Sequence, residues 1–465
     1  MQNKSLWSST LLNFWGYAGK LHLTLTDNII IRPDIAGNRP PGNVMFNKTL
    51  IAIRSFVVAV GATAASSFVG VFGVYIGATA IDMGWLQSTA NALSNGGQLL
   101  WGRLSDRVGR RRPFLIAGSA ILAVLWYMMG SIRTPVQLVV VYAAISLFAS
   151  LITVNWFSLI ADQTDTTTRG RFLSIINILS SLGTIGSLVV MTFLFQGQVT
   201  RDIFIPFSAS AGSYVISGIL MGMLKEPEKQ KELTGNIRKT LKELKKNPLF
   251  YKYFMAMNVQ GLFWSMAWPM FPITIVLVMH FNLSDVAILT VASLSMSVLV
   301  QYLLGKVTDN INRAPLILAN RMMLSAIPLL YAFFTNFWEF IIMELYSGVL
   351  GSIQNVVMNS YLLDIVPNGH RAEYISIING FNGIVYLAGA LTGGYLLQIM
   401  IDHFPLHLAL IFSYSIVFSG RFLSSLLFIG LKEPEQRGRT PLHLYSMLFR
   451  YKQPGSPSGG TMRFR

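Results

Sequence analysis

The sequence has no cysteine among its 465 residues, and only 12% of its residues are charged. Without cysteine, disulfide bonds, thiolate metal sites and cysteine nucleophiles are excluded. No HExxH, GxSxG or P-loop pattern occurs, and histidines such as His280 stand apart from carboxylate clusters. The sequence therefore predicts no enzyme, no catalytic residue and no bound metal or cofactor. A soluble protein carries about twice this fraction of charge, so the chain belongs in an environment other than water.

Long apolar runs make up most of the chain. A helix needs about 20 apolar residues to cross a bilayer. Twelve runs of roughly this length lie at 51–78, 84–101, 113–132, 136–161, 171–196, 203–224, 250–279, 286–304, 315–335, 337–363, 372–400 and 405–431. The expected fold class is an all-α membrane protein with twelve transmembrane helices.

The net charge of +16 is concentrated in a few short segments. A basic surface can indicate nucleic-acid binding, but nearly all of the 36 lysines and arginines lie in the two tails and in alternate loops. Loops rich in Lys and Arg mark the cytoplasmic side of a membrane protein. We therefore expect no nucleic-acid partner. The chain is expected to be a multi-pass protein of the lipid bilayer, in the cell (plasma) membrane, with both termini cytoplasmic.

Two related charged segments interrupt the apolar runs, GRLSDRVGRRR at 102–112 and GKVTDNINRAP at 305–315. A charged side chain at the bilayer centre costs about 3 kcal/mol, so both segments are expected to form turns at a membrane surface. The first resembles the signature between helices 2 and 3 of the Major Facilitator Superfamily of transporters. The residues that carry this resemblance are Gly102, Asp106, Arg107, Gly109 and Arg110, with Gly305, Asp309 and Arg313 as their counterparts.

The two halves of the chain repeat each other. Asp162 and Arg169 match Asp364 and Arg371, and LSIIN at 173–177 matches ISIIN at 375–379. Internal repeats of this kind are common in transporters. The expected organisation is a cytoplasmic tail (1–48), a six-helix bundle (49–224), a cytoplasmic linker (225–248), a second six-helix bundle (249–431) and a cytoplasmic tail (432–465).

The resemblance implies that helices 1, 4, 7 and 10 surround a central substrate cavity. Polar or small residues recur at helical spacing on these helices. The candidate cavity residues are Ser146 and Thr153 in helix 4, Asn258, Ser265 and Trp268 in helix 7, and Asn355 and Asn359 in helix 10. Such a stripe can equally serve packing, because small residues let membrane helices approach each other. Both interpretations stay open.

Charged side chains also occur inside several expected spans. Glu344 lies on the polar face of helix 10. Poor hydration favours the protonated form of a carboxylate, so Glu344 is a candidate proton carrier; the alternative is that it simply reaches the nearby surface. Arg54, Arg321 and Arg421 are expected to extend their charges to the membrane surface. For Arg54, contact with an anionic substrate is the alternative.

The resemblance also implies that the charged motifs hold the two halves together when the cavity opens outward. Asp106 would pair with a neighbouring helix end, and Arg110 with Asp162 or nearby carbonyls. In the second motif Asn310 and Asn312 replace an arginine and a glycine, so we expect a weaker latch there. In either case, basic loops set the topology.

These observations predict a secondary transporter that moves a small solute by alternating access and works as a monomer, with protons as one possible coupling ion. The low charge of the expected cavity favours a neutral or amphipathic solute over a phosphate ester. Two alternatives remain. One is an uncoupled facilitator, and the other is a membrane receptor or scaffold that kept the fold and lost transport.

Overall fold

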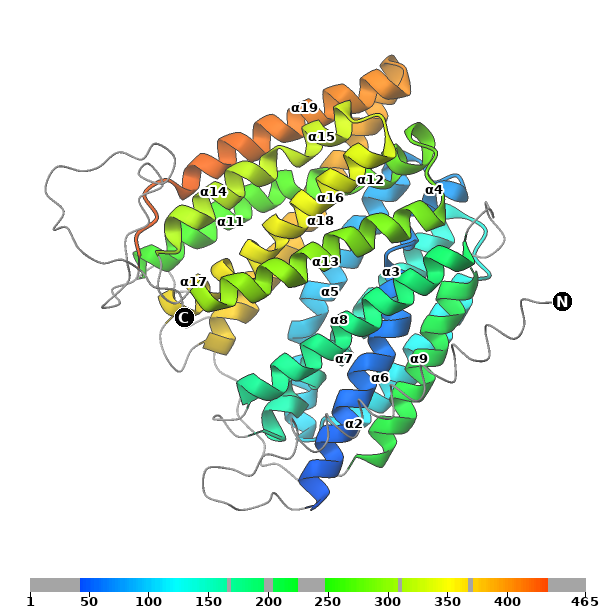
Figure 1. The fold of residues 1–465 in the computed structure, drawn as a ribbon, viewed down its shortest axis with the longest axis vertical. Helices are drawn as coiled ribbons and strands as arrows, with labels where there is room; N and C mark the ends of the chain where they lie inside the picture. The colour runs from blue at the N-terminus through cyan, green and yellow to red at the C-terminus, as the bar shows by residue number, and fades with distance from the viewer. Residues whose placement is uncertain are drawn as a thin grey trace, which may run out of the picture.

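The computed structural model describes residues 42–164, 169–195, 204–224, 247–307, 312–366 and 371–433. These residues are nearly all helical, and no β-strand occurs among them. The expected tails and the expected linker at 225–248 lie almost wholly outside the described residues. The chain forms two six-helix bundles, as the sequence predicts (Figure 1).

The first bundle begins with a segmented helix 1, which consists of α2 (Gly42–Val58), η2 (Ala59–Thr63), α3 (Ala64–Ser66) and α4 (Val69–Tyr75). Helix 1 thus begins at Gly42, ahead of the expected boundary at 49. Helices 2 to 6 are α5 (Ala80–Val108), α6 (Arg112–Met129), α7 (Pro135–Asp162), α8 (Arg169–Leu194) and α9 (Phe204–Met223).

The second bundle has three segmented helices. Helix 7 consists of α11 (Pro248–Met266), α12 (Met270–Ile273) and η3 (Thr274–Val278), helix 9 of α14 (Ala314–Ser325) and α15 (Ile327–Phe333), and helix 10 of α16 (Phe337–Ile353), η4 (Gln354–Met358) and α17 (Asn359–Ile365). Helices 8, 11 and 12 are α13 (Leu283–Val307), α18 (Arg371–His403) and α19 (Leu406–Ser425), the last followed by the short turn η5 (Leu426–Phe428).

Helices 1, 7 and 10 each contain a π-turn, namely η2, η3 and η4. A π-turn closes its hydrogen bonds over five residues instead of four, so it rotates the side chains that follow it and often occurs at functional sites. All three turns fall in helices that the resemblance assigns to the cavity. The sequence did not predict them, because an apolar run does not distinguish a π-turn from continuous α-helix.

Among the described residues, ten helices are long and apolar enough to cross a membrane. Helices 1 and 2 do not meet this criterion of length and apolar character, for different reasons. Helix 1 is divided, and its longest piece, α2, has 17 residues. Helix 2 has 29 residues but carries polar side chains such as Gln87, Asn91 and Ser94. These three side chains line a cavity inside the first bundle, which explains why a membrane helix carries them.

The first charged motif spans the end of α5, a short turn and the start of α6. α5 continues through Val108, so Gly102, Asp106 and Arg107 belong to its last two turns. Gly109 then ends the helix with φ of 72°, a left-handed conformation that glycine adopts without strain. Gly305 likewise lies in the last turn of α13. The expected turn is therefore limited to residues 109–111, because charges near the end of a long helix already reach water and residues 102–108 stay helical. Residues 308–311 of the second motif lie outside the described residues.

The two bundles repeat the same packing. In the first, α5 packs on α7, α6 on α9, and α2 on α8; in the second, α13 packs on α16, α15 on α19, and α11 on α18. Matching asparagines join matching helix ends. The Asn47 amide donates to the Gln163 side chain over 3.1 Å, and the Asn247 amide donates to the Ile365 carbonyl over 2.9 Å. The repeat seen in the sequence is therefore a structural repeat.

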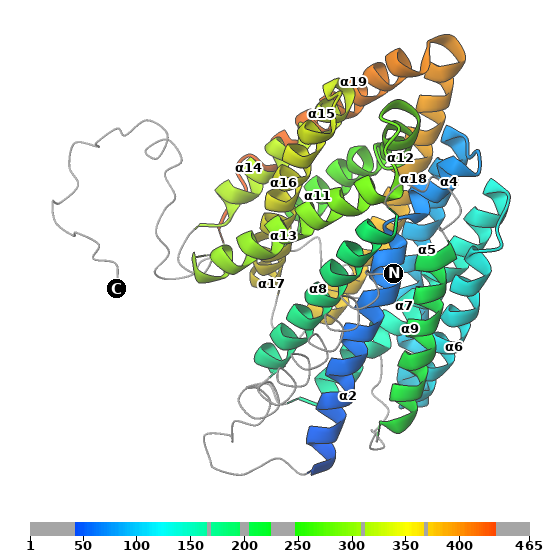
Figure 2. The same cartoon turned by 45° about the vertical axis from the view of Figure 1, so that its right-hand side comes forward.

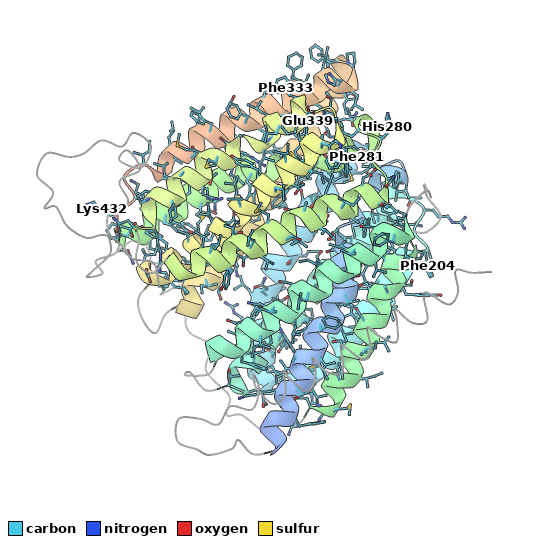
Figure 3. The ribbon with its side chains drawn as sticks, in the orientation of Figure 1. Phe204, His280, Phe281, Phe333, Glu339 and Lys432 are labelled. Carbon is cyan, nitrogen blue, oxygen red and sulfur yellow. The ribbon has the colours of Figure 1, made fainter. Side chains whose placement is uncertain are left out.

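The two ends of the molecule differ. We call the end that carries residues 103–112 and Arg313 the basic end, and the opposite end the far end. The bundles meet at the upper right of Figure 1 and separate towards the lower left, and Figure 2 shows the same divergence. In Figure 3, Phe281 and Glu339 mark the far end, whereas Lys432 marks the basic end.

The most extensive contact between the bundles joins α5 and α18. Two glycines allow it. A Cβ placed on Gly394 would lie 2.7 Å from the Ala80 carbonyl oxygen and 2.9 Å from the Cα of Gly84. One helical turn further along, the Ser88 hydroxyl donates to the Leu387 carbonyl over 3.1 Å. Small residues at such crossings let helix backbones approach and make van der Waals contact.

Two further hydrogen bonds join the bundles at the far end. The Tyr75 hydroxyl donates to the Phe281 carbonyl over 3.2 Å, and the Ser284 hydroxyl donates to the Thr192 carbonyl over 2.9 Å. Towards the basic end, the last hydrogen bond between described residues of α5 and α18 is a long one, 3.5 Å from Asn379 to Gln98. The bundles are therefore held together at and beyond the middle, on the far side.

We expect Gly394→Leu to open the far end, because the atoms that its side chain would meet are backbone atoms that cannot turn aside. Since the chain has no cysteine, Ser284→Cys would provide a single thiol at the closed contact. If the substitution destabilises the closed far end by about 1.4 kcal/mol relative to the open one, the open-to-closed ratio rises roughly tenfold. The rate at which maleimide labels the thiol should rise by the same factor.

The matched control is Gly212→Leu, because a Cβ on Gly212 meets nothing within 4 Å. Labelling of Ser284→Cys should be unchanged in that background. If Gly394→Leu labels no faster than the control, the α5–α18 contact is not what holds the far end closed.

Candidate functional site

Two adjoining cavities lie in the first bundle, with walls mainly from helices 1, 2 and 4 and single residues from helices 3, 5 and 6. The larger has a volume of about 360 Å³ and the smaller about 230 Å³. They share Val58, Ala149 and Tyr214 as lining residues. The smaller cavity includes residues nearer the basic end, since α2 begins and α7 ends there. Ligand sites are commonly concave and mostly apolar, with a few polar groups.

The predicted face of helix 4 forms one wall of both cavities. Ser146 lines the larger cavity and Thr153 the smaller. Each hydroxyl donates over 2.9 Å to the carbonyl four residues earlier, Tyr142 and Ala149 respectively. These bonds satisfy the hydroxyl protons within α7. The helical periodicity of the sequence thus identified a face that borders open space.

Helix 2 supplies a polar wall that the sequence reasoning missed. Gln87, Asn91 and Ser94 of α5 line the larger cavity together with the aromatic side chains of Trp126 and Tyr142. The sequence carried a signal for this wall, because these polar residues recur within a segment long enough to span the membrane. A polar residue inside a membrane helix generally faces the bundle interior or a water-filled cavity.

Arg54 lies inside the first bundle and does not reach the membrane surface. It lines the smaller cavity with a side chain that is 3% exposed. Its Nε donates to the Ser217 hydroxyl over 2.9 Å, and its guanidinium carbon lies 4.0 Å from the centre of the Trp156 ring. The expectation that Arg54 extends to the surface is wrong, because a hydroxyl and an aromatic face hold it in place.

The candidate residues of the second bundle have different surroundings. Asn355 and Asn359 are exposed, and the Asn359 amide donates to the Asn355 carbonyl over 2.9 Å. Asn258 is partly buried; its amide donates to the Phe254 carbonyl, while its Oδ1 is buried without a hydrogen-bond partner in the described structure. Helix 10 therefore presents two exposed amides where η4 meets α17.

Ser265 and Trp268 both contact α18. Ser265 is fully buried, its hydroxyl donates to the Leu262 carbonyl, and it contacts Gly389 of α18. Trp268 lies at the break between α11 and α12, with its ring 5.2 Å from that of Tyr386. For Ser265 the structure therefore favours the packing alternative, since a helix crossing covers its hydroxyl.

Arg321 and Arg421 also depart from the expectation of surface charges, since both are 1% exposed. Arg421 donates to backbone carbonyls of two neighbouring helices, at 2.6 Å for Trp264 and 3.5 Å for Leu324. Arg321 contacts the Met358 sulfur and lies 5.9 Å from the centre of the Trp264 ring. Carbonyl dipoles and aromatic faces replace water around these cations.

Glu344 lies in α16 and is partly buried. Its carboxylate makes side-chain hydrogen bonds with Ser293 and Tyr331, the latter at 3.5 Å. No cation among the described residues forms an ion pair with it. Tyr331 also borders a cavity of about 160 Å³ near the far end, which Thr335 and His407 line as well. Glu344 is thus a carboxylate held by neutral hydroxyl groups.

At the basic end of the first bundle, the arginine that pairs with Asp106 is Arg111. The two side chains lie 2.6 Å apart, and Arg111 also donates to the Ser105 hydroxyl over 2.6 Å. Arg112 donates to the carbonyls of Met221 (3.1 Å) and Gly222 at the end of α9. The cations after Gly109 therefore join helices 2, 3 and 6, and both partners of the Asp106 pair come from the first bundle.

The second bundle has a related ion pair with different members. Arg313 lies 2.5 Å from Asp364, and the Glu433 carboxylate accepts a hydrogen bond from the Ala314 backbone at the start of α14. Asn312 stands where the first motif has Gly109, so the second motif lacks the glycine whose φ of 72° ends α5. The side chains of Asp162, Arg169 and Arg371, the surroundings of Gly305 and the whole of Asp309 lie outside what the structure describes.

The sequence matches the model of a known protein family. The family model described as the Major Facilitator Superfamily matches residues 51–263 and 253–453. The chain belongs to the Major Facilitator Superfamily. Its membership was expected from the helix 2–3 motif, and the fold of two related six-helix bundles agrees with it.

Solved structures of transporters share the fold. The nucleoside transporter NupG aligns with a TM-score of 0.66 at 13% identity, over 83% of this chain and 98% of that one. The D-xylose-proton symporter gives 0.61 at 16% identity, over 85% and 98%. A bacterial homologue of the human lysosomal transporter Spinster, in an inward-facing and unoccupied conformation, gives 0.59 at 13%, over 84% and 99%.

One curated relative is similar in sequence. The class H tetracycline resistance protein of Pasteurella multocida is 30% identical over 152 residues, which are 32% of this chain. The match spans 36% of the length of that relative. Membership in the superfamily makes the chain a membrane transport protein by family.

Proposed function

We propose that this superfamily member is a secondary transporter that moves a small solute by alternating access. The observation that carries the proposal is that the bundles meet at the far end, while cavities in the first bundle extend towards the basic end. Rocking of two rigid bundles about a central site would close one end as it opens the other. The α5–α18 crossing supplies a contact about which such rocking can occur.

The test is transport by the purified protein in vesicles. A thermal-shift screen against a metabolite and drug library would first find a ligand, because a ligand that binds only the native state raises its Tm. Vesicles that contain the protein should then exchange that ligand across the membrane. A ligand that binds tightly but never exchanges would favour the alternative of a receptor or scaffold.

The basic end is proposed to face the cytoplasm of the cell (plasma) membrane, with both termini on that side. The support is the location of Lys and Arg in the tails and in alternate loops. With this orientation the conformation described above is the inward-open one. The chain is proposed to work as a monomer, since a single chain supplies both of the bundles that rocking requires.

The orientation predicts the outcome of reporter fusions at two positions. A fusion at Gly130, between α6 and α7, should report the outside of the cell, and a fusion at Leu233, between the two bundles, should report the inside. The physical reason is that basic segments resist translocation. Enzyme reporters active on one side only would measure this, and the reverse pattern at both positions would contradict the orientation.

Asp106 is proposed to act as a gate residue. In the open conformation its partner is Arg111, a residue of its own bundle. Closure of the basic end would bring the second bundle close to this pair. A charged group whose contacts differ between two states biases their populations. The motif of the second bundle is proposed to contribute less, because it retains fewer of the charged residues.

Asp106→Asn should reduce exchange severely, on the order of tenfold for a bias of about 1.4 kcal/mol, and should leave expression and ligand affinity nearly unchanged. Asp309→Asn should have a milder effect. Asp402→Asn is the matched control, because Asp402 is an exposed carboxylate at the far end whose side chain accepts from Gln398 of its own helix. If Asp106→Asn exchanges the ligand as fast as the control does, Asp106 does not act as a gate residue.

Glu344 is proposed to carry the coupling proton. It is held by the hydroxyl groups of Ser293 and Tyr331 and forms no ion pair with a described cation, and a carboxylate in poorly hydrated surroundings favours its protonated form. A nearby far-end cavity reaches Tyr331. These features would let the proton exchange as access alternates. The alternative is a facilitator without coupling.

Glu344→Gln imitates the protonated carboxylate, so it should abolish accumulation driven by an imposed pH gradient while sparing downhill exchange. The measurement compares both activities in the same vesicles. Glu339→Gln is the matched control, because Glu339 caps the start of the same helix at the far end. Full pH-driven accumulation in Glu344→Gln would exclude coupling at this residue and would favour the facilitator.

A further inference from the structure

We infer that Arg54 binds the anionic group of the solute, and that the solute is a small amphipathic carboxylate. This inference rests on the proposed function in so far as the bound molecule is cargo. It narrows the class expected from the sequence, a neutral or amphipathic solute, because the buried position of Arg54 was not foreseen. Three features of Arg54 support it: its fixed guanidinium, a nitrogen that lacks a partner, and the apolar walls of the cavity beside it.

Two neighbours fix the guanidinium of Arg54. Its Nε donates to the Ser217 hydroxyl, which lies 3.1 Å from the Ser119 hydroxyl, so α6 and α9 together hold one edge of the group. The ring of Trp156 covers one face, 4.0 Å from the guanidinium carbon. Preorganisation of this kind lowers the cost of ordering the side chain when a ligand binds.

One nitrogen of this fixed group has no partner. Nη2 of Arg54 is buried and has no hydrogen-bond acceptor in the described structure. No described carboxylate forms an ion pair with Arg54. An unsatisfied charged donor is costly to bury. The guanidinium faces a cavity of about 230 Å³, so an anionic ligand there would supply the missing acceptor and the missing charge.

The other buried arginines show what a structural role looks like. The guanidinium of Arg421 is surrounded by three backbone carbonyls, those of Phe263, Trp264 and Leu324. Arg321 contacts Met358 and Trp264. Its Nε is also buried without a hydrogen-bond partner in the described structure, but it lines none of the cavities described above. Arg54 combines burial, an unpartnered nitrogen and a place in a cavity wall, which is the combination that a ligand site requires.

The surroundings favour one carboxylate over a phosphate. The Ser55 and Thr153 hydroxyls of the same cavity already donate to Ile51 and Ala149 of their own helices. Arg54 is the one cation among the described residues that line the two cavities. A single guanidinium balances the one charge of a carboxylate and can donate to both of its oxygens in one plane. A phosphate ester carries two charges, so one of them would stay unpaired.

The remaining walls suit an apolar or aromatic body. Ile152, Trp156 and Phe157 line the smaller cavity with Arg54. The larger cavity is lined by the aromatic side chains of Trp126 and Tyr142 and by the amides of Gln87 and Asn91. A solute with its carboxylate at Arg54 and its apolar part along α7 would occupy both cavities and complement their walls.

The test compares acids with their uncharged isosteres on the purified full-length protein. The probes are benzoate, phenylacetate and indole-3-acetate, each paired with its carboxamide, and phenyl phosphate. We expect at least one acid to raise the Tm of the wild type more than its amide and more than phenyl phosphate. Arg54→Gln should weaken that acid on the order of tenfold, as expected for a charged hydrogen bond, and should abolish the preference for acid over amide.

The matched control is Arg321→Gln, a buried arginine outside the cavities, which should keep the preference for the acid. Arg54→Lys should keep part of it. If no acid exceeds its amide in the wild type, or if Arg54→Gln keeps the preference while its unliganded Tm falls, Arg54 is structural and the inference is wrong. An acid that binds through Arg54 but does not exchange across vesicles would refute the proposed function and leave this site in place.

Discussion

The contact on which the rest of the structure depends is the crossing of α5 and α18 at Gly84 and Gly394. In a bilayer, no hydrophobic force drives two helices together, because the lipid chains are as apolar as the side chains. Close backbone approach supplies the attraction, and a Cβ on Gly394 would already lie within 2.7 Å of the Ala80 carbonyl oxygen. Because this crossing holds the bundles at the far end, the polar lining of the first bundle is left near the opposite opening.

Buried cations are the second constraint on this molecule. Arg321 and Arg421 hold the helices of the second bundle together through carbonyls, sulfur and aromatic faces. Arg54 is held in part by Ser217 and Trp156. All three lie away from carboxylates among the described residues, which is unusual because buried charges are generally paired. Arg54 and Arg321 each keep one buried guanidinium nitrogen without a partner in the described structure. The place of Arg54 in a cavity wall is what separates a candidate ligand site from a packing residue.

The sequence predicted the fold because the signals for it are local and periodic. Apolar runs of about 20 residues, the positions of lysine and arginine, and the repeat of Asp162 and Asp364 in the two halves each reflect one requirement of the bilayer or of the repeat. The face of helix 4 with Ser146 and Thr153 followed from helical periodicity and the repeat. Family membership followed from the residues around Asp106.

The positions of the other site residues depend on contacts between segments that are distant in the chain. The periodicity of the sequence does not predict such contacts. The positions of Arg54 and Arg421 are decided by neighbours more than 150 residues away in the chain, Ser217 and Trp264. Ser265 has the spacing of a cavity residue, but Gly389 of another helix covers it. The π-turns change the register of helices 1, 7 and 10, and the partner of Asp106 is Arg111 because the helix continues to Val108.

The most direct test of the account measures both ends of the molecule at once. Since the chain has no cysteine, spin labels can be placed at Leu104 and Leu363 across the basic end, and at Val136 and Phe404 across the far end. The perturbation is Gly70→Leu, because a Cβ there would lie 2.8 Å from the ring of Pro272 in the other bundle. The distances between spin labels, measured by double electron–electron resonance, should lengthen across the far end and shorten across the basic end. A far-end distance that lengthens while the basic-end distance stays the same or also lengthens would contradict the rocking of two bundles.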